Sequence, residues 1–249
     1  KDAEISMEAN PGTLTESNLA GYHRAGINRL SLGCQSTEDM ELKLLGRIHS
    51  WAQFQESFQM AREAGFANLN VDLMSGLPKQ NLASWEKSLE VIAGMEPEHI
   101  SAYSLIIEEG TPFAEKKLEL PDEEEERRMY ERTWEILQSY GYHQYEISNY
   151  AREDYACYHN KVYWQRKNYL GLGIGAASMV DNRRMTNISD IYGYMETCET
   201  LESMDITQDI LLQSVLWQDV TELSKKDAME EFMFLGLRMN EGVTREAFE

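Results

Sequence analysis

Cysteine is scarce in this 249-residue chain, and the three cysteines, Cys34, Cys157 and Cys198, lie far apart. An odd number of distant cysteines is not typical of a disulfide framework, so we expect a reducing compartment, the cytoplasm. The chain has no Cys-x-x-Cys or similarly tight cluster. These residues therefore predict no metal site or iron–sulfur cluster within this segment.

Long hydrophobic runs and an excess of positive charge are also lacking. No apolar stretch approaches the roughly 20 residues that a membrane-spanning helix requires, and the polar start, Lys1–Pro11, is unlike a signal peptide. The 43 acidic residues outnumber the 23 basic ones, which gives a formal net charge of −20. This charge argues against nucleic-acid binding and against direct binding to anionic lipid, although peripheral membrane contact stays open.

Strands and helices are expected to alternate through the first part of the chain. The predicted strands are Glu4–Glu8, Asn28–Gly33, Asn68–Met74 and His99–Leu105. Strands and helices that alternate at this spacing predict βαβ units and a parallel sheet, either open or closed into a barrel, with ligands at the carboxyl ends of the strands. The apolar run Leu69–Leu73 further predicts a sheet covered on both faces. Beyond it we expect a long helix over Pro121–Gly141, a strand over Tyr145–Ser148, irregular structure with short strands over 150–185 and helices from Asp190 onward.

Polar residues lie at or near the ends of the predicted strands. Glu8 closes the first strand, Gln35 closes the second, and Asp72 lies within the third. Isolated carboxylates are costly to bury unless they are paired or bound to a ligand. The residues alone leave open whether these side chains form a structural ion pair with Arg47 or a ligand site.

Several segments resemble, in order, the oxygen-independent coproporphyrinogen III oxidase family of radical S-adenosylmethionine (SAM) enzymes. They are Glu8–Gly12, Arg29–Ser36, Leu44–His49, Asn70–Pro78, His99–Leu105 and Glu109–Pro112. The resemblance implies an α/β fold, a partial (β/α)6 barrel, that binds SAM and a [4Fe–4S] cluster. The implied SAM contacts are Glu8, Gln35, Arg47 and Asp72, with backbone or apolar contacts at Ile106 and Ala177. Family members often carry His at the position of Ala177.

The same resemblance implies an organisation in three parts. Residues 1–115 would be the later part of the barrel, residues 116–185 a helix and short strands that complete it, and residues 186–249 a smaller, mainly helical region that stops short. The family's Cys-x-x-x-Cys-x-x-Cys loop is expected upstream of Lys1. Without it, this segment would not cleave SAM.

A second group of residues is the string His159, Asn160, Tyr163 and Trp164. An imidazole can ligate haem iron while aromatic rings cover the porphyrin. From the residues alone, a loop histidine beside a strand that buries its aromatic residues is the simpler explanation. The spacing His-Asn-x-x-Tyr-Trp nevertheless resembles the signature of the family's HemW-type haem-chaperone branch. That resemblance implies haem binding and delivery of haem to apo-proteins.

Three functions therefore remain open. The first is a haem chaperone of porphyrin metabolism. The alternative is coproporphyrinogen III oxidase, which removes carboxyl groups from propionates with a SAM-derived radical. A third is an unrelated barrel enzyme with a metal or sugar at its carboxylates, although the metal-ligand spacing for it is missing. The glycine-rich stretch Gly171–Ser178 lacks the spacing of a dinucleotide-binding loop, so we expect tight backbone packing there.

Overall fold

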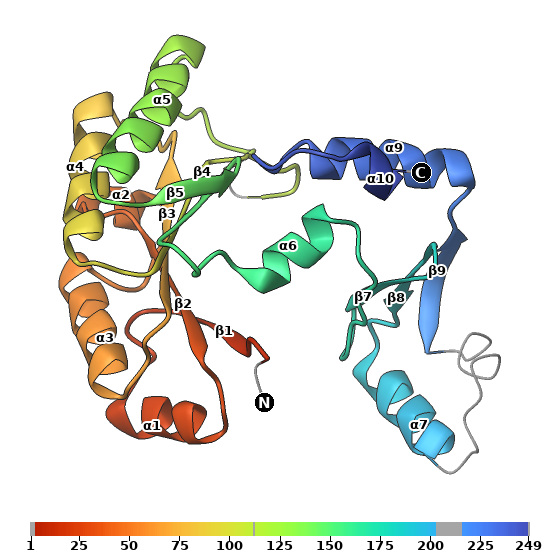
Figure 1. The fold of residues 1–249 in the computed structure, drawn as a ribbon. Helices are drawn as coiled ribbons and strands as arrows, with labels where there is room; N and C mark the ends of the chain where they lie inside the picture. The colour runs from red at the N-terminus through yellow and green to blue at the C-terminus, as the bar shows by residue number, and fades with distance from the viewer. Residues whose placement is uncertain (1–2, 112, 203–215, 249) are drawn as a thin grey trace. The chain divides into compact units, whose positions relative to one another are not determined.

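The computed structural model describes residues 3–111, 113–202 and 216–248. The chain forms two compact units, residues 1–159 and 160–249 (Figure 1). The expected boundaries at 115/116 and 185/186 stay predictions. Among the described residues, no helix is long and apolar enough to cross a membrane.

A six-stranded sheet forms the centre of the first unit, with the strand order β1-β2-β3-β4-β6-β5. Its strands are β1 (Ser6–Ala9), β2 (Arg29–Gln35), β3 (Leu69–Ser75), β4 (His99–Ser104), β5 (His143–Glu146) and β6 (Asn149–Ala151). Strands β1 to β4 pair in parallel, which confirms the predicted parallel sheet. The strand expected over residues 145–148 is confirmed for Tyr145 and Glu146, which end β5, whereas residues 147 and 148 form the turn of the antiparallel hairpin β5–β6. The Glu146 carboxylate accepts hydrogen bonds from the Ser148 N–H and the Asn149 amide at this turn.

Helices follow each parallel strand, as the sequence predicts. They are α1 (Glu16–Arg24), α2 (Asp39–Leu44), α3 (Trp51–Glu63), α4 (Leu82–Gly94) and α5 (Glu123–Ser139). The longer ones begin at polar N-caps whose side chains accept a backbone N–H of the first turn: Thr15, Ser50, Asn81 and Asp122. The acidic run lies in the first turn of α5, where the helix dipole favours negative charge.

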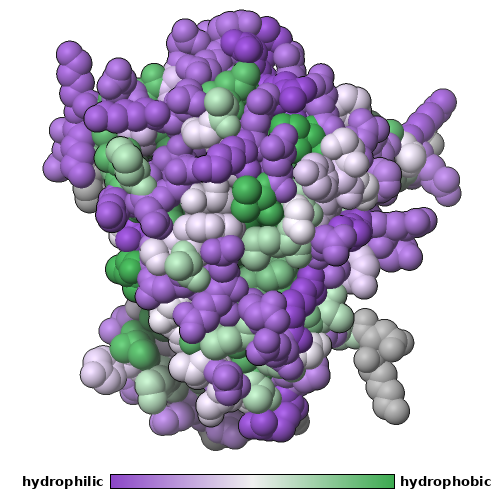
Figure 2. Space-filling view, turned by 90° about the vertical axis from the view of Figure 1, so that its left-hand side faces the viewer, coloured by the Kyte–Doolittle hydropathy of each residue, from purple (hydrophilic) through white to green (hydrophobic). Residues whose placement is uncertain are grey.

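The two faces of the sheet differ in chemistry, because alternate residues of a strand point to opposite faces. One face is apolar and packs against α1, α3, α4 and α5, which lie together beside the sheet (Figure 1). Its residues include Leu30, Leu32, Cys34, Leu69, Val71, Leu73, Ile100 and Ala102. The other face is polar, with Ser31, Gln35, Asn70, Asp72, His99, Ser101 and Tyr103. Its residues Ser31, Gln35, Asn70 and His99 are nonetheless buried, and the expectation of a sheet covered on both faces stays a prediction. The outward side of the helices, turned to the viewer in Figure 2, carries mostly hydrophilic side chains.

The second unit contains a three-stranded antiparallel sheet, ordered β7-β8-β9. Its elements are β7 (Ala177–Val180), β8 (Arg183–Asn187), α7 (Ile191–Glu202), β9 (Trp217–Glu222), α9 (Lys225–Gly236) and α10 (Arg245–Phe248). Helix α6 (Tyr158–Trp164) crosses the boundary of the units in sequence and occupies a region that we expected to be irregular. The helical prediction for residues 203–215 lies outside the described residues.

Candidate functional site

A buried hydrogen-bond network occupies the polar face of the first sheet, and Asn70 on β3 is its centre. The Asn70 amide nitrogen donates to Ser31 Oγ (2.7 Å) and to Asp72 Oδ1 (2.8 Å). Its amide oxygen accepts from Ser101 Oγ (3.2 Å) and lies 2.5 Å from His99 Nδ1. One amide thus links β2, β3 and β4, and fixes the positions of the side chains around it.

His99 is fully buried and neutral within this network. Its Nδ1 faces the Asn70 amide oxygen, an acceptor, so Nδ1 carries the proton. Its Nε2 lies 2.9 Å from the Tyr145 hydroxyl and accepts a hydrogen bond from it. Burial holds the pKa of His99 well below its usual value, and the charge of Arg29 lowers this pKa further. We conclude that His99 is a structural member of the network, because both ring nitrogens are engaged.

Asp72 lies at the middle of β3, and both of its carboxylate oxygens accept hydrogen bonds within the network. Ser31 Oγ donates to Asp72 Oδ2 at 3.1 Å. Burial raises the pKa of Asp72; hydrogen bonds from Asn70 and Ser31 oppose this rise, and the Glu8 carboxylate adds to it. Two negative groups therefore act on each other at this edge of the sheet. A cationic ligand would relieve their repulsion.

Tyr103 on β4 lies where the four predicted polar residues converge. Its hydroxyl donates to Gln35 Oε1 at 3.0 Å. Burial is the main cause that raises the pKa of Tyr103; the charges of Asp72 and Glu8 raise it further, while Gln35 and Arg47 lower it. The charges of Glu8, Arg47 and Asp72 thus act on the Tyr103 hydroxyl, and Gln35 is hydrogen-bonded to it. The sequence did not single out Tyr103, and the role of the four predicted residues in one SAM site stays a prediction.

Gly33 leaves space on this polar face. It lies between Ser31 and Gln35 on the same face of β2, and a Cβ atom at Gly33 would lie 3.1 Å from Gln35 Nε2. Gln35 itself ends the strand with a φ of 69°. A side chain at position 33 would therefore press on the Gln35 amide and fill the space in front of it.

The two other residues predicted to contact SAM, Ile106 and Ala177, are exposed to solvent. Ile106 follows β4 and is 79% exposed. Ala177 opens β7 in the second unit and is exposed, so its place beside the first-unit site stays a prediction. The packing expected in this glycine-rich stretch is present, because a Cβ at Gly171 would lie 2.3 Å from the Ala177 carbonyl oxygen.

The start of α6 is fastened to the start of the described chain. Glu4 accepts hydrogen bonds from the backbone N–H groups of Tyr158 (3.0 Å) and His159 (3.2 Å), and lies 3.5 Å from Cys157 Sγ. Burial acts to raise the pKa of Glu4, but these hydrogen bonds and the charge of Arg29 outweigh it and lower the pKa. Glu4 thus holds the backbone of His159, while the His159 side chain is exposed. No sequence pattern had indicated Glu4.

A hollow of about 290 Å³ lies within the second unit. It is lined by Asn160, Tyr163, Trp164, Arg166, Tyr169, Met179, Arg184 and Leu235. Three of the four residues of the predicted haem group, Asn160, Tyr163 and Trp164, therefore meet in one hollow. His159 belongs to the first unit and directly precedes Asn160 in the chain.

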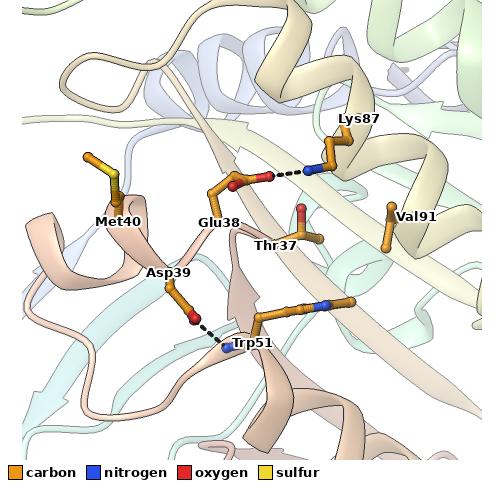
Figure 3. Close-up of a pocket in the computed structure, with 7 residues that line it drawn as sticks. All are labelled: Thr37, Glu38, Asp39, Met40, Trp51, Lys87 and Val91. Atoms are coloured by element: carbon orange, nitrogen blue, oxygen red, sulfur yellow. Dashed lines mark hydrogen bonds and ion pairs between the residues drawn. The ribbon is translucent and has the colours of Figure 1, made fainter.

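A separate hollow, also about 290 Å³, lies among α2, α3 and α4 (Figure 3). Glu38 and Lys87 form an ion pair across it at 2.6 Å, and the Trp51 backbone N–H donates to Asp39 Oδ1 at 2.8 Å. Its ionic groups thus bind each other. This hollow lies among the helices, whereas the network around Asn70 lies on the opposite, polar face of the sheet.

Comparison with known proteins agrees with the fold. The radical SAM superfamily matches residues 1–92, and the HemN C-terminal domain matches residues 223–249. Residues 1–92 thus carry the radical SAM superfamily match and residues 223–249 the HemN C-terminal domain match, which confirms the resemblance seen in the sequence. The relatives of the chain include proteins named heme chaperone HemW.

Three comparisons give the extent of the likeness. The HemW protein of Bacillus subtilis (strain 168) is 37% identical over 99% of this chain and 63% of its own length. That of Synechocystis is 36% identical over 98% of this chain and 58% of its own length. The structure of coproporphyrinogen III oxidase (HemN) from Escherichia coli superposes with a TM-score of 0.75 at 24% identity, over 96% of this chain and 56% of that one. This chain thus spans about three fifths of those HemW proteins, and the likeness to HemN concerns the fold.

Proposed function

We propose that this protein is a haem-binding radical-SAM protein that acts as a haem chaperone. The observation that carries the proposal is the meeting of Asn160, Tyr163 and Trp164 in one hollow. Relatives named heme chaperone align with nearly the whole chain, which supports the same function. The partners in this proposal are haem and the apo-proteins that receive it, in the cytoplasm.

His159 is the proposed haem ligand. Its side chain is exposed, while its backbone is held by Glu4, so the imidazole starts from a fixed point of the chain. Neutral imidazole is a common ligand of haem iron. The aromatic side chains Tyr163 and Trp164 offer the apolar surface that a porphyrin needs.

SAM is the second proposed ligand, bound on the polar face of the first sheet. Glu8 and Asp72 suit its positive charge and its hydroxyl groups, because their carboxylates repel each other until a cation lies between or beside them. The Arg47 guanidinium suits the methionyl carboxylate. Gln35 offers an amide beside the space that Gly33 leaves. Ile106 and Ala177 are proposed to complete the contacts.

The residues described here do not fit the role of cluster ligands. Among them, no group of three His, Cys, Asp or Glu side chains could hold a metal ion. Burial also raises the pKa of the Cys34 thiol well above its usual value, which disfavours the thiolate that a cluster requires. A bound [4Fe–4S] cluster would supply the electron that cleaves SAM. The residues of this chain bind and orient SAM in our proposal.

The haem proposal is tested by titrating the full-length protein with haem and following the Soret band. We expect a shifted Soret band that saturates, and an affinity at least about tenfold lower in His159→Ala, since the iron loses its ligand. His143→Ala is the matched control, because His143 is also exposed but lies at the start of β5. No saturable Soret shift, or equal affinities in the two variants, would remove haem ligation by His159.

Coproporphyrinogen III oxidation is the competing activity, and the same protein tests it. Anaerobic incubation of cluster-reconstituted protein with SAM and coproporphyrinogen III should leave the substrate unchanged. Formation of decarboxylated product would replace the chaperone proposal by the oxidase.

A further inference from the structure

We infer that the hollow in the second unit is a tetrapyrrole-carboxylate site, in which Arg184 binds a propionate and Glu231 positions Arg184. This inference rests on the proposed haem function and extends it to side chains outside the His-Asn-x-x-Tyr-Trp string. It also names the part of the ligand that is recognised: the carboxylates, independently of the iron.

The walls of the hollow suit a flat aromatic ligand. Tyr163 and Tyr169 pack edge to face, with ring centroids 4.6 Å apart. The Arg238 guanidinium lies over the Trp164 ring, 4.2 Å from its centroid, and fixes that indole by a cation–π contact. Met179 and Leu235 add aliphatic surface. Rigid aromatic walls with few polar groups are typical of sites for apolar cofactors.

The charges at the hollow form a small fixed cluster. Glu231, whose side chain is 11% exposed, accepts from Arg166 Nε at 3.0 Å and pairs with Arg184 Nη1 at 3.0 Å. Two guanidinium groups against one carboxylate leave one net positive charge. A positive centre beside aromatic walls stands out in a chain whose formal net charge is −20. It matches a ligand that is apolar over most of its area and anionic at one edge.

Arg184 and Arg166 have different roles within this cluster. The Arg184 side chain is 44% exposed and the Arg166 side chain is 12% exposed, so Arg184 is the group that an incoming carboxylate reaches first. Arg166 holds Glu231 from the other side. Two buried N–H groups of the lining, Trp164 Nε1 and Arg166 Nη2, have no acceptor among the described residues. Buried donors without acceptors are rare in folded proteins, and a bound oxyanion would supply acceptors.

The hollow of about 290 Å³ holds only part of a porphyrin, so we assign it to the propionate edge and the adjoining pyrrole rings. If the hollow were only a gap in the packing, we would not expect a charged side chain such as Arg184 to be held beside it by an ion pair. A neutral apolar molecule would make no use of the Arg184 guanidinium, which is 44% exposed beside the hollow, whereas a carboxylate can bind it with charge-assisted hydrogen bonds.

The test uses metal-free protoporphyrin IX and its dimethyl ester, titrated into the full-length protein and followed by porphyrin fluorescence. The two probes share the macrocycle and differ in the charge of the propionates. The variants are Arg184→Ala, Arg184→Lys and the control Arg183→Ala. Arg183 carries the same charge on the same strand, and the alternation along β8 points it to the opposite face. The ion pair between Arg166 and Glu231 remains in all of them, and thermal unfolding checks that each variant is folded.

We expect the wild-type protein to bind the acid about tenfold more tightly than the ester, and Arg184→Ala to abolish this preference. Arg184→Lys should recover part of it, because lysine keeps the charge but loses the planar fork. Equal affinity for acid and ester, an Arg184→Ala variant equal to Arg183→Ala, or no porphyrin binding would each overturn the inference. The haem titration stays separate: loss of iron ligation in His159→Ala with an unchanged ester preference in Arg184→Ala would support the chaperone proposal and refute this site.

Discussion

Glu4 and His159 are 155 residues apart in sequence, and the His159 backbone N–H donates a hydrogen bond to the Glu4 carboxylate at 3.2 Å. The neighbouring N–H of Tyr158 donates to the same carboxylate at 3.0 Å. Glu4 lies two residues before β1, the strand that carries Glu8. One short segment therefore contains both a proposed SAM contact, Glu8, and the side chain that holds the backbone of the proposed haem ligand, His159. The position of His159 therefore depends on a side chain outside its own helix.

Replacing Glu4 should loosen the start of α6. In Glu4→Ala the two backbone N–H groups lose a charged acceptor, so the start of α6 should lose about 1–3 kcal/mol of local stability and its hydrogen exchange should accelerate. Haem affinity should fall several-fold. Glu4→Gln keeps an acceptor oxygen and should lie between. Glu56→Ala, at an exposed glutamate of α3, is the control. Unchanged exchange at Tyr158 and His159 in Glu4→Ala would show that this carboxylate does not position the helix.

Asp72→Asn should separate ligand binding from stability. Burial and the Glu8 charge raise the pKa of Asp72. The ionised carboxylate at neutral pH therefore lowers the free energy of unfolding, because it is less stable in the folded protein than in the unfolded chain. The neutral, isosteric amide removes that cost, and we expect the free energy of unfolding at pH 7 to hold or rise. SAM affinity of the cluster-reconstituted full-length protein should fall about tenfold or more, because the cation loses its counter-charge.

Calorimetric titration with SAM and urea unfolding measure the two effects. Asp154→Asn is the control, because Asp154 is exposed and asparagine tolerates its φ of 68°. An Asp72→Asn variant that binds SAM as tightly as the wild type would contradict the proposed site.

Much of the sheet could be predicted from local patterns. Apolar runs, turn residues and N-caps such as Ser50 and Asn81 are local signals, and the structure has the parallel strands where they indicate. Glu8, Gln35 and Asp72 could be expected together, because carboxyl ends of parallel strands meet at one edge. Only the resemblance to a family made them candidates for a SAM site, since strand-end carboxylates also form plain ion pairs.

The residues that were missed depend on pairing between distant segments. Tyr103 becomes part of the site only because β4 lies beside β3 in a register that places its hydroxyl near Gln35. The partner of His99 is Tyr145, on a hairpin that pairs antiparallel next to β4. Alternation along β4 could have indicated that His99, Ser101 and Tyr103 share a face. It could not have indicated which side chains meet them.

His99 should make the stability of the protein depend on pH. Its pKa in the folded protein lies well below the usual value of 6.5, so the unfolded chain binds more protons below pH 6.5. The stabilisation that comes from keeping His99 neutral is complete above pH 6.5. The free energy of unfolding falls as the pH is lowered from 6.5 toward the pKa of His99 in the folded protein, by up to about 1.4 kcal/mol per pH unit. Urea unfolding between pH 5.5 and 7.5 measures this slope.

His99→Gln is the variant that isolates the effect, because glutamine does not titrate. It should be less stable than the wild type at pH 7.5, since the bonds to Asn70 and Tyr145 change, but its pH slope should be shallower. Burial also lowers the pKa of His49. Because His49 is present in both proteins, its effect on the pH slope cancels in the comparison. Identical slopes would mean that His99 is not held neutral in the folded protein.

Gly171 should tolerate no side chain. A Cβ atom there would lie 2.3 Å from the Ala177 carbonyl oxygen and 2.9 Å from its carbonyl carbon, both of which are backbone atoms that cannot rotate away. The strand that would have to move, β7, also carries Met179, which exchanges backbone hydrogen bonds with Tyr169 at 2.9 and 3.0 Å. Both residues line the hollow of the second unit. Gly171→Ala should therefore destabilise the protein by about 1–3 kcal/mol and weaken protoporphyrin binding.

Gly21→Ala is the matched control for this substitution. Gly21 lies inside α1, a Cβ there meets nothing within 4 Å, and alanine should stabilise the helix by about 0.5–1 kcal/mol. The same chemical change is thus expected to act in opposite directions at the two positions. Thermal unfolding of both variants, together with the fluorescence titration, measures the difference. If Gly171→Ala unfolds at or above the wild-type temperature and binds porphyrin normally, then β7 does not depend on the close backbone contact between Gly171 and Ala177.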